Sequence, residues 1–293
     1  MEGPQISAEV LLQAAIGGVL TGFVYALVAA GLSLIFGLME IVNFAHGEFL
    51  MVAMYLAFFA WALAGLDPVV SLPGVVGALA LLGAATYRGL IRRVLGGPML
   101  AQIFATFGLA VFLRSAAQAL FGVDFRAVQQ PWLAGRVAVG GVYLGLPQLA
   151  ASGAALAAFL LLTLFLARTE TGLALQATAQ DRQAAALMGI DTERMFTLGW
   201  MLGAACVGVA GGLLAMYFYV FPDVGGTFAL LAYVTVALGG FGNVPATLGA
   251  GVLVGLVEAL AGLLVVPAMK YAVVFLLYLG VVLWRPQGLF GRF

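Results

Sequence analysis

The stretch VLTGFVYALVAAGLSLIFGLMEIVNFAHGEFLMVAMYLAFFAWALAG, residues 19–65, decides the class of fold. Two long apolar runs flank a short polar cluster, and neither run alternates polar and apolar residues as a barrel strand does. A helix needs roughly 20 consecutive apolar residues to cross a bilayer core about 30 Å thick. The stretch therefore predicts two membrane-spanning helices that are separated by a break.

The rest of the chain continues this pattern. Of the 293 residues, 64% are hydrophobic and only 8% are charged, whereas soluble domains contain about 25% charged residues. Further apolar runs fall at 69–87, 99–121, 142–166, 196–220, 227–239, 246–265 and 269–284. We therefore predict an all-α polytopic membrane protein, with residues 1–293 in one integral-membrane domain of about eight to ten helices. The net charge of zero gives no reason to expect a nucleic-acid partner.

Basic residues mark the expected cytoplasmic side. Eight of the twelve lie in three regions, two breaks between apolar runs and the segment after the last run: Arg88, Arg92, Arg93, Arg168, Arg182, Arg194, Arg285 and Arg292. Cytoplasmic loops carry an excess of Lys and Arg. This bias predicts a cytoplasmic C-terminus and a coupling segment at 168–195 on the same side. Counting back along the runs places the N-terminus outside and residues 37–48 near the cytoplasmic side.

The polar cluster at 40–48 predicts a broken helix beside a translocation path. Non-helical backbone at membrane depth is tolerated only where it is buried in protein or lines a cavity. We expect Gly47 to permit the turn, Asn43 to bind freed backbone groups, and Glu48 to suit the start of the next helix. His46 is the only histidine, so we predict neither a metal site nor a cofactor.

A second stretch, GGFGNVPATLGAGVLVGLVEALAG at 239–262, has the same layout as residues 43–65. Each has a break containing Gly and Asn, followed by an apolar helix that ends in Ala-Gly. The echo predicts a second broken helix at 239–246, with Gly239, Gly240, Gly242 and Asn243 as candidate path residues, and two pseudo-repeated halves. The alternative is a chance similarity between Ala- and Gly-rich helices.

Two charged residues lie inside apolar runs. A charge at the centre of a spanning helix costs about 2.5–3.5 kcal/mol. We therefore expect Glu258 to face the protein interior, a cavity or a subunit seam; the alternative is a position near the membrane surface. Arg114 raises the same question. Trp61, Trp132, Trp200 and Trp284 are expected at the membrane interfaces.

The segment 168–195 is the most charged part of the chain. Asp181 can cap a short helix, Gly189 can end it, and Thr192 can cap the helix that follows. The candidate residues for docking a cytoplasmic partner are Asp181, Arg182, Ala184, Ala185, Leu187, Met188 and Gly189. The alternative is a solvated connector. If the surface docks a partner, a charged residue at Ala185 or Leu187 should weaken docking without unfolding the spans.

Four motifs together resemble one transporter family. They are YALVAAGLSLIFGLMEIVNFAHGEFLMVAMY (25–55), GLALQATAQDRQAAALMGID (172–191), VALGGFGNVPATLGAGVLVGLVE (236–258) and RPQGLFG (285–291). Their order and spacing are similar to those of permease subunits of branched-chain amino acid ABC importers, of the LivH type. The sequence departs from that family at Gln176 and Leu231, where relatives commonly carry basic residues.

The resemblance implies a set of partners. A LivM-like second permease would complete the translocation path, two cytoplasmic ATP-binding subunits would drive transport, and an extracytoplasmic binding protein would deliver the substrate. The chain itself contains no G-x-x-x-x-G-K-[ST] motif, so no P-loop binds ATP here. An enzyme is not expected. Three alternatives remain: a permease of the same family for amides, urea or another small solute, a transporter or channel that acts alone, and a membrane scaffold.

Overall fold

The computed structural model describes residues 7–291. Within them, eight helical segments are long and apolar enough to cross a membrane. They are α1 (Ala8–Met39), α2 (His46–Ala64), α3 (Pro68–Thr86) continuing through Tyr87–Ile91 into α4 (Arg92–Val94), α5 (Met99–Phe121), α6 (Leu146–Arg168), α9 (Thr192–Leu214), α11 (Ala246–Leu264), and Pro267–Met269 continuing into α12 (Lys270–Trp284). The predicted all-α polytopic fold is confirmed.

Three shorter helices complete the helical part: α7 (Glu170–Gln180), α8 (Arg182–Leu187) and α10 (Val224–Gly239). With 16 residues, α10 is about 24 Å long and is shorter than a full span. It begins three residues before the apolar run at 227–239. The segment 168–195 is therefore mostly helical, because its ends belong to α6 and α9 and only short links separate α7 and α8.

A β-hairpin, β1 (Arg136–Val139) and β2 (Val142–Gly145), replaces the start of one expected helix. The run at 142–166 was expected to be helical throughout, but α6 begins only at Leu146. Gly140 and Gly141 have φ values of 58° and 85°. Two such residues form the turn that suits a two-residue hairpin loop, and β-branched residues flank it.

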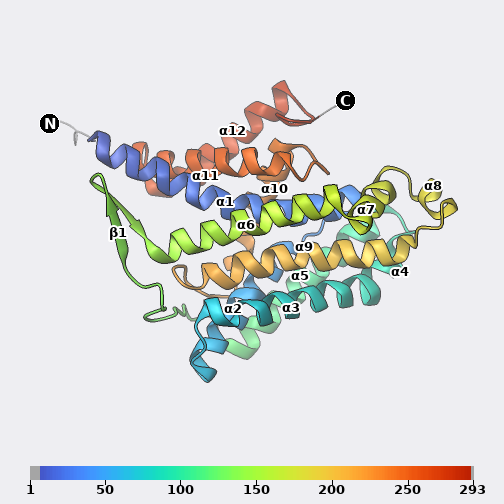
Figure 1. The fold of residues 1–293 in the computed structure, drawn as a ribbon, viewed down its shortest axis with the longest axis horizontal. Coiled ribbons are helices and arrows are strands. Elements are labelled where there is room, and N and C mark those ends of the chain that lie inside the picture. The colour runs from blue at the N-terminus through green and yellow to red at the C-terminus, as the bar shows by residue number, and fades with distance from the viewer. Residues whose placement is uncertain (1–6, 292–293) are drawn as a thin grey trace.

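The long helix α1 lies at the centre of the fold, and α11 packs against it in the opposite direction (Figure 1). A Cβ atom built at Gly18 would lie 2.7 Å from the Gly255 carbonyl oxygen, and one at Gly251 would lie 2.6 Å from the Ala26 nitrogen. The pairs Gly18/Gly22 and Gly251/Gly255 thus let the two backbones touch, as small residues do in membrane helix packing.

The other central helix is α9, which packs on α1, α2, α3 and α6. Trp200 on α9 is fully buried, and its carbonyl group faces Gly83 of α3. The expectation that Trp200 anchors the chain at a membrane interface is therefore wrong, because a tryptophan on a central helix fills the core. Trp132 and Trp284 are mostly exposed, as interface anchors would be.

The two ends of the helix bundle differ (Figure 1). The β-hairpin and the start of α1 lie at one end, which we call the hairpin end. The helices α7 and α8 lie at the opposite end, which we call the α8 end. The helices α5 and α12 lie at the periphery and expose large apolar side chains along their length.

Two breaks correspond closely along the chain. The helices α2 and α11 each have 19 residues and begin at residues 46 and 246. The breaks before them begin at Glu40 and Gly240, with φ values of 56° and 96°. The non-helical residues are 40–45 and 240–245, so both breaks are shorter than the expected 40–48 and 239–246. The two six-residue breaks and the two 19-residue helices after them have the layout that a repeated element predicts.

Candidate functional site

The first break is held by Asn43, which is fully buried. Its Oδ1 accepts a hydrogen bond from the Ala45 backbone nitrogen at 3.1 Å. Its carbonyl oxygen accepts one from the Tyr233 hydroxyl at 2.8 Å and another from the His46 nitrogen at 3.1 Å. Asn43 thereby satisfies backbone groups that the break frees, and it connects the break to α10.

His46 is the first residue of α2 and is fully buried. Its Nε2 lies 2.8 Å from the carbonyl oxygen of Val28, eleven residues before the end of α1. The break therefore returns along α1, and α2 begins beside the middle of that helix. Among residues 7–291 no group of three potential metal ligands is found.

Gly47 lies inside the first turn of α2, so it does not form the turn that the sequence led us to expect. A Cβ atom at Gly47 would collide with the carbonyl oxygen of Gly225. One at Gly225 would lie 2.6 Å from the Gly47 carbonyl oxygen. Gly47 is needed because the first turns of α2 and α10 cross at backbone contact.

Glu48 forms an ion pair that links three elements. The Nη2 of Arg114 on α5 binds Glu48 Oε1, and Arg114 Nε donates to the same oxygen at 3.2 Å. Arg114 Nε also lies 3.7 Å from Oδ1 of Asp223, the residue before α10. The sequence marked Glu48 and Arg114 separately, but 66 residues separate them and no local pattern pairs them.

The second break contains Gly240, Gly242 and Asn243, while Gly239 is the last residue of α10. Asn243 Oδ1 accepts from the Ala246 nitrogen at 3.3 Å, and its Nδ2 donates to the Phe290 carbonyl oxygen at 3.2 Å. A Cβ at Gly242 would lie 3.3 Å from Gly37. The second break therefore touches the end of α1 and the C-terminal tail.

A cavity of about 790 Å³ lies between this break and α7. The residues that line it come from the end of α1, the end of α6, α7, the break and the tail, and include Glu40, Gln176 and Asn243. Gln176 Nε2 donates to the Leu166 carbonyl oxygen at 2.5 Å. Gln176 therefore joins α7 to α6.

Glu258 lies apart from both breaks. Its Oε2 accepts from the Tyr25 hydroxyl at 2.6 Å and its Oε1 binds Lys270 Nζ at 2.6 Å. It borders a cavity of about 460 Å³, lined also by Tyr143 of the hairpin and Gln148 at the start of α6. Glu258 is nearly buried and borders a cavity, as expected, and it lies six residues before the end of α11, so the alternative position near the membrane surface stays open. Its partner is the only lysine of the chain.

The candidate docking residues are gathered at the α8 end. Asp181 caps α8, because its Oδ1 accepts from the nitrogens of Gln183 at 2.8 Å and Ala184 at 2.9 Å. Gly189 follows α8 with φ at 85°. Asp191, not Thr192, caps α9, since its Oδ1 accepts from the Arg194 nitrogen at 3.0 Å. Asp191 precedes the first helical residue, and Thr192 is already inside the helix.

The apolar residues of α8 do not share one face. Ala185 is buried, whereas Leu187 and Met188 are 88% and 82% exposed. Ala184 is also exposed. Two large apolar side chains therefore project from the tip of the molecule, and Ala185 packs α8 onto the fold.

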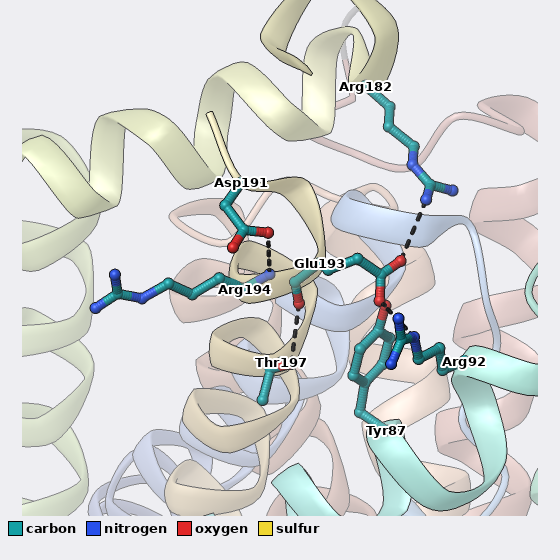
Figure 2. A network of polar contacts seen from close by, with 7 residues as sticks. All are labelled: Tyr87, Arg92, Arg182, Asp191, Glu193, Arg194 and Thr197. Atoms are coloured by element: carbon teal, nitrogen blue, oxygen red, sulfur yellow. Dashed lines mark hydrogen bonds and ion pairs between the residues drawn. The ribbon is translucent and has the colours of Figure 1, made fainter. Parts of the chain in front are cut away.

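Glu193 holds α8 in place, and the sequence alone did not identify it. Figure 2 shows its carboxylate between side chains of two other elements. Oε2 lies 3.0 Å from Arg92 Nε and 3.1 Å from the Tyr87 hydroxyl, and Oε1 lies 3.4 Å from Arg182 Nη2. Glu193 thus connects α8 and α9 to the end of the third span. The charged residues at the end of the third span, on α8 and at the start of α9 are far apart in the chain, so no local pattern pairs Glu193 with its partners.

Comparisons with known proteins agree on one family. The sequence model described as branched-chain amino acid transport system / permease component matches residues 14–282. The high-affinity branched-chain amino acid transport system permease protein BraD of Pseudomonas aeruginosa is 31% identical over 296 residues, which cover 96% of each chain. LivH of Escherichia coli K12 is 31% identical over 298 residues, again 96% of each chain.

A more distant relative comes from an archaeon. A probable branched-chain amino acid transport permease protein LivH of Methanocaldococcus jannaschii is 27% identical over 256 residues, which cover 83% of this chain and 79% of that protein. No solved structure matches the chain.

Proposed function

The chain belongs to the family of permease components of branched-chain amino acid transport systems, and we propose that it forms one half of the translocation path of an ABC importer. It is a multi-pass inner-membrane transport protein and not an enzyme. The proposed partners are a second, LivM-like permease, two cytoplasmic ATP-binding subunits and an extracytoplasmic substrate-binding protein. The proposed substrates are branched-chain amino acids.

The observation that carries this proposal is the pair of exposed apolar side chains at the tip of α8. Leu187 and Met188 project from a short helix that is capped at both ends by Asp181 and Gly189. Exposed apolar residues that cluster on a rigid element are typical of a protein interface. The proposed interface is with an ATP-binding subunit, which places the α8 end and the C-terminal tail in the cytoplasm.

Glu193 would couple movement at that interface to the membrane-spanning helices. Arg182 of α8 and Arg92 of α4 bind opposite oxygens of its carboxylate. A displacement of α8 by an ATP-binding subunit would therefore pull on α9 and on the third span at once. Both elements pack against the core helices, so the movement would reach the path as a rigid-body shift.

The path itself is proposed to pass the two breaks. Asn43, His46, Gly47 and Glu48 lie at the start of α2, and Gly239, Gly240, Gly242 and Asn243 lie at the second break. Transporters commonly bind substrates at broken helices near the membrane midplane, and the first break leads to α2 beside the middle of α1. The second break lies beside the end of α1 and α7, nearer the α8 end. Glu258 is proposed to border the path at the hairpin end.

The test is reconstitution of the purified complex in proteoliposomes. The α8 end faces the vesicle interior, which contains ATP, and the substrate-loaded binding protein is added outside. We expect ATP-dependent uptake of radiolabelled leucine, isoleucine and valine. Uptake of urea in preference to leucine would replace the proposed substrate class. Uptake by this chain alone, driven by an ion gradient, would contradict the ABC mechanism.

A further inference from the structure

The crossing of α2 and α10 brings together three charged residues and two helix N-termini. We propose that Arg114 binds the carboxylate, and Asp223 with Glu48 the ammonium group, of an amino acid during its passage. This inference rests on the proposed function, because it assigns the contacts by which the path recognises an α-amino acid zwitterion.

The three charges lie at membrane depth, and two of them, Arg114 and Asp223, are only partly covered. Arg114 is seven residues before the end of α5, about 10 Å inside that end of the helix. Its side chain is 38% exposed and that of Asp223 is 59% exposed. Charges in such a place face a cavity or a protein neighbour and not lipid. This surface is therefore one wall of a polar space, which the second permease would close.

Arg114 and the start of α10 together form an anion site. A guanidinium has five N–H donors, and in residues 7–291 the side-chain hydrogen bonds of Arg114 go only to Glu48 Oε1. Asp223 precedes α10 without a capping side-chain bond. The nitrogens of Val224 and Gly226 already donate to the carbonyl oxygens of Phe221 and Asp223 at 3.2 Å, so α10 contributes the positive end of its dipole. A Cβ at Gly226 would lie 3.6 Å from Arg114 Nη2. A carboxylate bound there meets both.

Glu48 and Asp223 supply the acceptors for an ammonium group. Glu48 is 2% exposed, yet its Oε2 has no hydrogen-bond partner in the described part of the chain. This oxygen lies 2.7 Å from a Cβ built at Gly225, so it points at the first turn of α10. An unpartnered buried carboxylate oxygen is costly, and a bound ammonium donor removes that cost. Asp223 offers a second carboxylate across Arg114.

An aromatic wall lies beside these charges. Tyr55 and Phe121 stack with centroids 4.8 Å apart. Each lies seven residues, or two helical turns, beyond Glu48 and Arg114 on α2 and α5. The Tyr55 hydroxyl is buried without a hydrogen-bond partner among residues 7–291. Polar groups at one end of an apolar wall are the arrangement that small-molecule sites use to orient a ligand.

The experiment measures leucine uptake and ATP hydrolysis by the whole reconstituted complex with loaded binding protein. We expect Arg114→Gln to lower uptake at least 10-fold while ATP hydrolysis stays within about 2-fold of the wild type, because substrate is released without being guided through the path. Asp223→Asn, at a more exposed position, should show the same loss of uptake per ATP. Arg114→Lys, which keeps the charge, should recover part of the wild-type uptake per ATP hydrolysed.

Arg136→Gln is the control, since it removes an arginine side chain that stacks on Tyr143 in the β-hairpin, apart from the three charges. It is expected to keep the wild-type ratio of uptake to ATP hydrolysed. An unchanged ratio in Arg114→Gln and Asp223→Asn would overturn the site. If neither variant assembles, the cluster has a purely structural role, and the proposed binding site is overturned as well. Absence of leucine uptake by the wild-type complex would instead refute the proposed function.

Discussion

Asn43 and Asn243 make the same kind of hydrogen bond in two breaks that lie 200 residues apart in the chain. In each case Oδ1 accepts from a backbone nitrogen at the start of the next helix, at 3.1 Å and 3.3 Å. The two differ in burial, because Asn43 is fully buried and Asn243 is partly exposed. Water can replace the amide in the second break but not in the first.

We therefore expect Asn43→Ala to lower the free energy of unfolding by about 1–3 kcal/mol and Asn243→Ala by less than about 1 kcal/mol. Thermal unfolding of the purified permease in detergent, followed by tryptophan fluorescence, measures both. Equal losses in the two variants would mean that burial does not decide the role of these amides.

The contact between Gly47 and Gly225 leaves no space for a side chain. Gly47→Ala should therefore push α2 from α10 and destabilise the fold by about 1–3 kcal/mol. Gly153→Ala on α6 is the control, because a Cβ there meets nothing within 4 Å; it should be neutral or stabilising by up to about 1 kcal/mol. A neutral Gly47→Ala would contradict the close crossing.

Leu187 and Ala185 should respond differently to a charge. Leu187→Glu changes a side chain that is 88% exposed, so it should leave thermal stability unchanged and weaken co-purification of the ATP-binding subunits at least 10-fold. Ala185→Glu places a charge in a packed site and should also lower stability. In both variants the spans are still expected to stay folded. Full assembly of the Leu187→Glu complex would argue against the α8 interface.

Removal of the Glu193 carboxylate should free α8 with little loss of global stability. Its ion pairs are partly exposed, and such pairs contribute about 0–1 kcal/mol each. In Glu193→Gln we expect faster hydrogen exchange of the amides in 182–190, measured by mass spectrometry, and an unfolding temperature close to the wild type. Glu170→Gln, at the start of α7, is the control. Unchanged exchange would show that Ala185 alone fixes α8.

The pair formed by Glu258 and Lys270 can be tested by removing one or both charges. Lys270→Met leaves a nearly buried carboxylate without its cation and should destabilise by about 1–3 kcal/mol, at the lower end because Lys270 is one-third exposed. Adding Glu258→Gln to Lys270→Met should recover most of the lost stability. A double variant less stable than Lys270→Met would show that the pair is favourable in itself.

The sequence was sufficient for the features that depend on local chemistry. Runs of apolar residues located the spans, and Asn and Gly located both breaks to within a few residues. The Asp181 cap and the Gly189 turn were predicted because each depends on only a few adjacent residues. The hairpin was missed, although the Gly140–Gly141 pair between β-branched residues was a usable signal.

Features that depend on which helices become neighbours were beyond the sequence. Spans in lipid need no polar face, since lipid is as apolar as the protein core, so the contact face of a helix leaves little pattern. Glu48 stood out as a helix-start residue and Arg114 as a membrane charge, but their pairing required the packing of α2 against α5. Glu193 looked like an ordinary first-turn residue until α4 and α8 were placed beside it.

The glycine contact between α1 and α11 has a consequence for biosynthesis. About 230 residues separate Gly22 from Gly251, and a ribosome adds roughly 5–20 residues per second. The face of α1 that packs against α11 is therefore in the membrane for about 10–50 s before α11 is synthesised. Throughout that time the nascent permease exposes a narrow glycine groove that the insertion machinery, or another helix, is able to occupy.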